Sequence, residues 1–152
     1  MMNLRGRDLR DLRLHCVFAL ICLACFLLSS CGSSVKSAEL AQQNVEHFHS
    51  QLNSEQYTAI YAASDEKLHQ ATSEPDFVQL LGAVHRKLGS VQESNLRNTG
   101  VAWFAGRGAT VTLVYETRFA EGTGIEKFVW HIKDNSASLY GYNINSNALV
   151  AK

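Results

Sequence analysis

The spacing of hydrophobic residues divides the chain into an apolar stretch, a helical part and a strand part. Thirteen residues from Cys16 to Leu28 carry no charge and are almost all apolar. After a short polar segment, apolar residues recur every three or four positions as far as Leu88, which is the helical period. From there to Asn145 apolar and polar residues alternate, as in strands with one buried face. The pattern predicts an α+β fold in which N-terminal helices pack on a curved four-stranded antiparallel sheet.

The helical period predicts two helices in the residues that follow the polar segment. The first covers about Ala38 to Leu52, and its apolar stripe consists of Ala41, Val45, Phe48 and Leu52. A cap formed by Asn53 with Gln56 is expected to start the second helix. The apolar residues of this second helix are Tyr57, Ile60 and Tyr61.

A third helix is expected between Ser73 and Gly89. Ser73 is a typical N-cap residue, Asp76 follows three positions later, and Pro75 lies in the first turn. Glycine is the usual residue just after a helix, so Gly89 marks the end. The apolar stripe of this helix consists of Phe77, Leu80, Leu81, Val84 and Leu88.

Alternation predicts four strands joined by tight turns. Their approximate ranges are 90–104, 111–119, 127–132 and 136–145, and the expected turns are 106–108, 121–122 and 134–135. A turn at Glu121-Gly122 pairs neighbouring strands in a definite register. The expected pairs are Tyr115 with Phe128, Leu113 with Trp130, and Glu116 with Lys127.

The last strand admits two arrangements. A turn at Asp134-Asn135 places Leu139 beside Trp130. Without a bulge, the following apolar residues then point away from the core and form a second apolar face, which is our candidate binding face. Its residues are Val129, His131, Tyr140, Tyr142 and Ile144. In the alternative arrangement a β-bulge resets the register of this strand.

The N-terminal stretch has the layout of an export signal. Four arginines against two aspartates make the segment before Cys16 basic. A helix of thirteen residues is roughly 20 Å long, shorter than the ~30 Å hydrocarbon core of a bilayer. We therefore expect residues 1–30 to be a cleaved signal peptide that forms a signal helix. An uncleaved signal anchor is the alternative.

The residues Leu28-Ser29-Ser30-Cys31 resemble the lipobox of bacterial lipoproteins, an aliphatic residue and two small residues before a cysteine. The resemblance implies cleavage between Ser30 and Cys31 and acylation of Cys31, which anchors the protein in a lipid bilayer. Cys25 is a weaker match because Cys22 stands where the motif has an aliphatic residue. The expected organisation is a signal peptide (1–30), a lipidated flexible tether (31–37) and one domain (38–152).

Cleavage before Cys31 also limits the chemistry of the mature chain. The other three cysteines leave with the signal peptide, so neither a disulfide nor a cysteine metal site is expected in the domain. Basic and acidic residues are nearly equal in number after the cut, which argues against nucleic acid as a partner.

No sequence motif indicates a catalytic, metal or cofactor site, and none is predicted. His47 and His49 lie about 200° apart on a helix, so they do not share a metal ion, and both are expected at the surface. His131 is the histidine best placed for chemistry, with Glu116, Glu126 and Tyr140 as neighbours. Alternation, however, puts His131 and Glu126 on opposite faces of their strand.

The order of elements resembles the nuclear-transport-factor-2-like, cystatin-like fold over about Ala38 to Leu149. The segments that carry the resemblance are the third helix ending at Leu88-Gly89 and the strands 111–115, 126–130 and 139–144. The resemblance implies helices packed on a curved sheet. Proteins of this fold include isomerases, dehydratases and binding modules, so the fold does not select a function.

We expect a non-enzymatic lipoprotein anchored to the cell envelope, whose domain binds an envelope protein or a small apolar ligand. In a host with two membranes, Gly32 after the acylated cysteine favours the outer membrane facing the periplasm, by resemblance to sorted lipoproteins. The alternative is a pocket enzyme, an isomerase or hydrolase, that uses His131 or a carboxylate with a tyrosine. A structural spacer is a third hypothesis.

Overall fold

The structure is a computed structural model that describes the backbone of residues 31–150 and the side chains of residues 34–150. The predicted signal peptide and the side chain of Cys31 lie outside this part. Residues 36–150 belong to one compact unit, and the description below concerns this unit and the helical residues 31–35 that precede it. No helix within residues 31–150 has the length and apolar character needed to cross a membrane.

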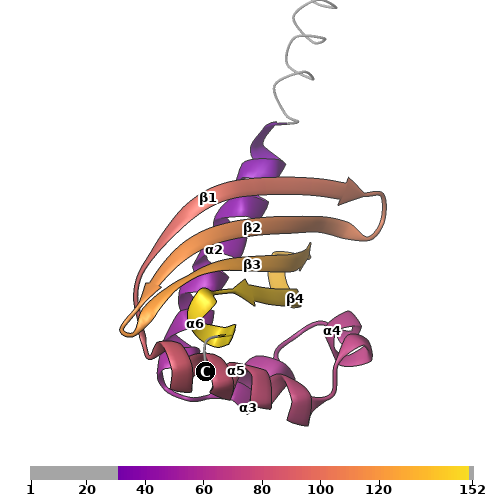
Figure 1. The fold of residues 1–152 in the computed structure, drawn as a ribbon. Helices are drawn as coiled ribbons and strands as arrows, with labels where there is room; N and C mark the ends of the chain where they lie inside the picture. Colours follow the sequence, from indigo (N-terminus) through magenta and orange to yellow (C-terminus); the bar gives the residue numbers. More distant parts are fainter. Residues whose placement is uncertain (1–30, 151–152) are drawn as a thin grey trace, which may run out of the picture. The chain divides into compact units, whose positions relative to one another are not determined.

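Helices precede strands, as the sequence predicts, so the α+β fold is confirmed (Figure 1). The first helices are α2 (Cys31–Asn53), α3 (Tyr57–Ala62), α4 (Glu66–Ala71) and α5 (Glu74–Leu88). The strands are β1 (Val91–Phe104), β2 (Gly108–Phe119), β3 (Gly122–Lys133) and β4 (Ser136–Asn145), followed by the short helix α6 (Asn147–Val150). The strands form one antiparallel meander in the order β1-β2-β3-β4.

The core lies between α2 and one face of the sheet, with α2 crossing the strands in Figure 1. The predicted stripe of α2 is buried: Ala41, Val45, Phe48 and Leu52 are each at most 1% exposed. The ring of Phe48 packs edge-on against Phe128 of β3, with 5.1 Å between the centroids. We call the sheet face turned away from α2 the outer face.

Helix α2 is longer than predicted. It begins at Cys31 rather than near Ala38, so the segment 31–37, expected to be a flexible tether, is helical. Serine and glycine cost at most about 1 kcal/mol each in a helix. Extending a helix that is already formed requires no new nucleation. The buried side chain of Ser37 also belongs to this segment.

The predicted Asn53–Gln56 cap is wrong. Gln56 is the N-cap residue of α3, but its side chain makes no capping hydrogen bond. Asn53 ends α2 and binds the backbone of Val91 twice: its Nδ2 donates to the Val91 carbonyl at 3.2 Å, and its Oδ1 accepts from the Val91 amide at 2.8 Å. Asn53 therefore joins the end of α2 to the start of β1.

Helix α5 matches the prediction at both ends. The Ser73 hydroxyl accepts from the amide of Asp76 at 3.4 Å, and Gly89 follows the last helical residue with a φ of 73°. A Cβ at Gly89 would lie 2.9 Å from the Cβ of Ala120, so glycine is needed there. Leu80 differs from the prediction, because 40% of its surface is exposed.

The β2–β3 turn falls at Ala120-Glu121, one residue before the predicted position. Leu113 consequently pairs with Phe128, and Tyr115 pairs with Glu126. The turn is held by the amides of Ala120 and Glu121, which donate to the carbonyls of Ser90 and Leu88. Because their amides bind the end of α5 and the residue before β1, Ala120 and Glu121 do not pair within the β2–β3 ladder.

The predicted pair of Glu116 with Lys127 is therefore wrong. Glu116 lies opposite Ile125, and its carboxylate instead binds the guanidinium of Arg97 on β1. The pairing has shifted by two residues, and a shift of two leaves each side chain on its predicted face. Leu113 and Trp130 accordingly share the core side of the sheet, as expected.

The β3–β4 hairpin contains the bulge that the sequence left as an alternative. Its turn is at Asp134-Asn135, and Trp130 pairs with Leu139, as predicted. Val129, however, pairs with Gly141, so Tyr140 is an extra residue without a partner in the ladder. The bulge places the next alternate residue, Tyr142, opposite Phe128.

Candidate functional site

The bulge divides the five residues of the candidate binding face between the two sides of the sheet. Val129 and His131 lie on the outer face, since they alternate with the core residues of β3. Tyr140 is 40% exposed. Tyr142 and Ile144 are instead partly buried against the core. The five residues therefore do not form one continuous face.

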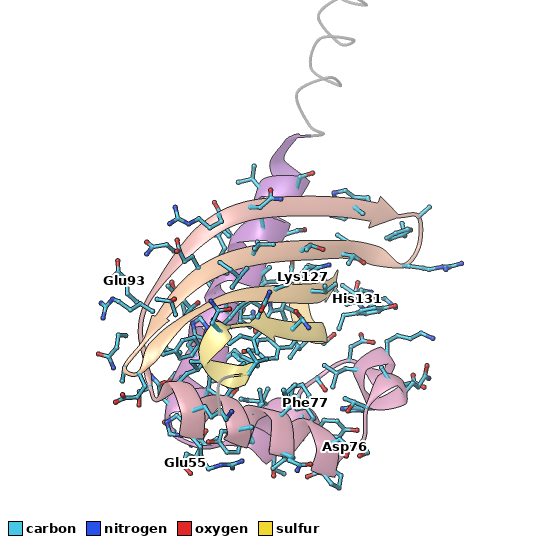
Figure 2. The ribbon with its side chains drawn as sticks, in the orientation of Figure 1. Glu55, Asp76, Phe77, Glu93, Lys127 and His131 are labelled. Atoms are coloured by element: carbon cyan, nitrogen blue, oxygen red, sulfur yellow. The ribbon has the colours of Figure 1, made fainter. Side chains whose placement is uncertain are left out.

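His131 is the centre of a polar cluster near the end of β3 that lies above α4 in Figure 2. Its Nδ1 lies 2.9 Å from Oδ2 of Asp65, and its Nε2 lies 2.8 Å from the carbonyl oxygen of Arg107. Ser138 of β4 donates its hydroxyl to the same Asp65 oxygen at 3.1 Å. These contacts join α4, the β1–β2 turn and the β3–β4 hairpin, and we call them the His131 clamp.

Asp65 has its place in the clamp because it is also the N-cap of α4. Its Oδ1 accepts from the Lys67 amide at 2.9 Å, and its own amide donates to the Leu139 carbonyl at 2.9 Å. The start of α4 is therefore tied to β4 through both backbone and side chain. The sequence pattern did not predict α4, which is six residues long and buries only Leu68.

The clamp favours the doubly protonated form of His131. A carbonyl oxygen and a carboxylate both accept hydrogen bonds, so both ring nitrogens must donate, and only the imidazolium has two N–H groups. The bond to the Arg107 carbonyl, followed by the bond to Asp65, raises the pKa of His131 against the opposing effect of burial. Burial raises the pKa of Asp65, but bonds from the Lys67 amide, His131 and Ser138 outweigh it and lower the value.

A groove of about 610 Å³ lies beside the clamp. Residues of the sheet, the β1–β2 turn and the start of α4 line it: Asp65, Glu66, Lys67, Ala102, Phe104, Gly106, Arg107, Thr110, His131, Lys133 and Tyr140. Protein sites for small molecules typically measure about 300–1,000 Å³. The groove thus has the size of a small-ligand site, and it contains His131 and Tyr140 of the predicted binding face.

A second polar cluster is enclosed in the core. Glu126 is fully buried and accepts hydrogen bonds from three side chains on three elements. His49 Nε2 lies 2.8 Å from its Oε2, the Thr117 hydroxyl binds the same oxygen, and the Tyr142 hydroxyl donates to Oε1 at 2.7 Å. We call these four residues the Glu126 cluster.

The surface position predicted for His49 is wrong, whereas His47 is exposed as predicted. His49 is 7% exposed because it follows Val45 by four residues and precedes Leu52 by three, which places it beside the apolar stripe. Helical spacing could therefore have identified it. Strand alternation places Glu126 on the same face of β3 as Phe128 and Trp130. This shared face is the sequence signal for the burial of Glu126.

The Glu126 cluster has the groups of an acid–base site but no access to solvent at its centre. Burial raises the pKa of Tyr142 well above its usual value, and the adjacent Glu126 carboxylate adds to the effect. His131 lies on the other side of β3, as alternation predicted. In this structure the cluster therefore connects α2 with β2, β3 and β4, and the exposed groove is the better candidate for a ligand site.

Neither a protein-family model nor a curated protein matches the chain. Among the residues that the structure describes, no group of three or more histidine, cysteine, aspartate or glutamate side chains is arranged to hold a metal ion.

Proposed function

We propose that this chain is a lipid-anchored binding module of the bacterial cell envelope, and that it binds a small ligand in the groove beside His131. The groove is the observation that carries the proposal. It has a suitable volume, and the His131 clamp fixes three of the segments that line it. Exposed aromatic surface is available as well, since Phe104 and Tyr140 are 52% and 40% exposed.

The proposed anchor is an acylated Cys31, produced by cleavage after Ser30. Its support is the lipobox-like sequence Leu28-Ser29-Ser30-Cys31 behind a basic leader and an apolar stretch. In a host with two membranes the proposed location is the outer membrane, facing the periplasm. The domain is proposed to have a nuclear-transport-factor-2-like, cystatin-like fold, on the support of its helices followed by a four-stranded antiparallel sheet.

Binding is favoured over catalysis by the state of the candidate acids and bases. Both nitrogens of His131 are engaged with the protein, so the ring has no nitrogen free to accept a proton from a substrate. Glu126 does contact a tyrosine hydroxyl, but it is 0% exposed. These two observations support the binding module over the isomerase or hydrolase alternative.

A groove-filling variant tests the proposal. Thr110 lines the groove, and Thr110→Trp is expected to occupy part of it. Thr112→Trp is the matched control, two residues along the same strand and outside the lining residues. The intact lipoprotein would be purified from its own envelope and its bound small molecules measured by native mass spectrometry.

We expect a bound small molecule in the wild type and in Thr112→Trp, and its loss in Thr110→Trp. Equal occupancy in both variants would place the ligand elsewhere. A wild-type protein that carries no small molecule would contradict the proposal for this groove.

A further inference from the structure

We infer that the groove takes a small amphiphile with one anionic head group, a carboxylate or a phosphate, and a short apolar chain. This inference rests on the proposed function, because it names the ligand class for the same groove. It is carried by two features of the lining: cationic side chains that belong to no ion pair among the described side chains, and exposed aromatic surface.

The cations of the groove exceed the negative charge available to balance them. Lys67, Arg107 and Lys133 line the groove, and no ion pair within the described side chains includes any of them. Lys67 Nζ donates to the neutral side chain of Gln70 at 3.0 Å. An anionic group in the groove would therefore find cationic donors that the protein itself does not neutralise.

The two carboxylates of the lining are already engaged. Asp65 accepts from His131, Ser138 and the Lys67 amide, so its charge faces the imidazolium of the clamp. Glu66 accepts from Gln70 Nε2 at 2.9 Å on its own helix. With His131 protonated, four cationic side chains stand against two carboxylates, and the local charge is positive.

The apolar part of the groove determines the remainder of the ligand. Phe104 lies at the end of β1, and Tyr140 is the bulged residue of β4. Covering an exposed aromatic ring with an apolar group is favourable, because it removes apolar surface from water. An inorganic anion would leave the rings exposed to water. A ligand that satisfies both features has an anionic head group beside the cations and an apolar chain over the aromatic rings, and is therefore an amphiphile.

A series of six-carbon probes tests the inference. Hexanoate, hexyl phosphate, 1-hexanol and hexylammonium share one chain and differ in head group and charge. Each would be titrated into the isotopically labelled full-length lipoprotein in phosphatidylcholine nanodiscs, and binding would be followed by backbone amide shifts. Ala102, Thr110 and Tyr140 supply the amides that report on the groove.

We expect hexanoate or hexyl phosphate to bind about ten-fold more tightly than hexanol, as for a charge-assisted contact. Hexylammonium is expected to leave the groove amides unshifted. The comparison of hexanoate with hexyl phosphate shows which anionic head group is preferred.

Charge-reversal variants localise the effect. Lys133→Glu and, independently, Arg107→Glu are expected to abolish the preference for the anionic probes. Lys127→Glu is the matched control, because Lys127 is exposed on the same strand and the same face but does not line the groove. Each variant must first show wild-type amide shifts in the core.

Each contrary outcome has a separate meaning. Equal affinity for hexanol and hexanoate at the groove amides would overturn the anionic head group and leave the proposed groove site standing. An equal loss in Lys127→Glu and Lys133→Glu would show general charge attraction and overturn the inference. Groove amides that respond to none of the four probes would count against both the inference and the proposed function.

Discussion

At the scale of single residues, Glu126 shows how a carboxyl side chain is accommodated in the core. Removing an ionised carboxylate from water is costly unless donors replace the lost hydration. His49, Thr117 and Tyr142 provide such donors from α2, β2 and β4. A single buried side chain therefore bonds to both layers of the domain.

Replacing Glu126 should reduce stability in a graded way. Glu126→Leu leaves three buried polar groups without their acceptor, and we expect a loss of about 3–5 kcal/mol in the free energy of unfolding. Glu126→Gln keeps the shape and one acceptor oxygen, so its loss should be smaller. Urea denaturation measures both.

The control for this series is Glu116→Leu, which removes an exposed partner of Arg97. Exposed ion pairs contribute about 0–1 kcal/mol, so this variant should stay close to the wild type. A Glu126→Leu protein as stable as Glu116→Leu would show that the Glu126 cluster contributes nothing to stability.

The His131 clamp makes part of the stability depend on pH. The folded pKa of His131 is raised above 6.5, so its contribution is fully present below 6.5 and is lost as pH rises through the folded value. The folded pKa of Asp65 is lowered below 3.8, so its contribution is present above 3.8 and is lost as pH falls through the folded value. The clamp is therefore complete between 3.8 and 6.5.

His131→Gln should consequently differ from the wild type most within that interval. We expect the difference in the free energy of unfolding to shrink when the pH exceeds the folded pKa of His131. Urea denaturation at a series of pH values measures it, with Asp65→Asn as the companion variant that removes the carboxylate. A difference that stays constant from acid to alkaline pH would contradict the protonated clamp.

At the scale of elements, the bulge in β4 decides which side chains reach the core. The sequence offered either a second apolar face or a bulge, because alternation alone does not reveal an extra residue. The extra residue is Tyr140, and beyond it Tyr142 contacts Phe48 and Phe128 with centroid distances of 4.9 and 5.2 Å. The extra residue thus leaves Tyr140 exposed and places Tyr142, which is partly buried, against the core.

Deleting Tyr140 should leave the fold intact. The shortened strand would run from Leu139 directly to Gly141. These two residues pair with Trp130 and Val129, which are already consecutive in β3. Deleting Asn143 is the control, because it would turn Ile144 away from the core side. Urea denaturation should show a clearly larger loss for the Asn143 deletion. Equal losses would mean that the bulge is not an independent insertion.

At the scale of the whole molecule, the features visible in sequence are those with local periodicity. The α2 stripe and the bounds of β4 follow from spacing alone. The groove was not predicted, because Asp65, Arg107 and His131 come from three segments that are distant in sequence. Polar contacts between distant segments do not produce a periodic pattern in the sequence. Helix α4 has only six residues, which is too short for a recognisable apolar stripe.

The proposed anchor gives a prediction for the whole chain. The mature wild-type protein should have the mass of residues 31–152 plus acyl groups, and it should sediment with membranes. Cys31→Ser removes the acceptor, so it should carry no acyl group and keep residues 1–30. Intact-mass spectrometry distinguishes the two. A wild-type protein that keeps residues 1–30 without acylation would contradict the anchor, and Cys25→Ser is the control for the rival cysteine.

The His131 clamp also has a consequence for the order of folding. It joins Asp65 to a residue 66 positions later and also includes Arg107 and Ser138, so its full set of bonds requires all three hairpins of the meander. Closing so long a loop is entropically costly, and contacts of large sequence separation form slowly. The groove is thus completed late on the folding pathway. A ligand held there would stabilise only chains that have finished folding, and occupancy would distinguish mature molecules from partly folded ones.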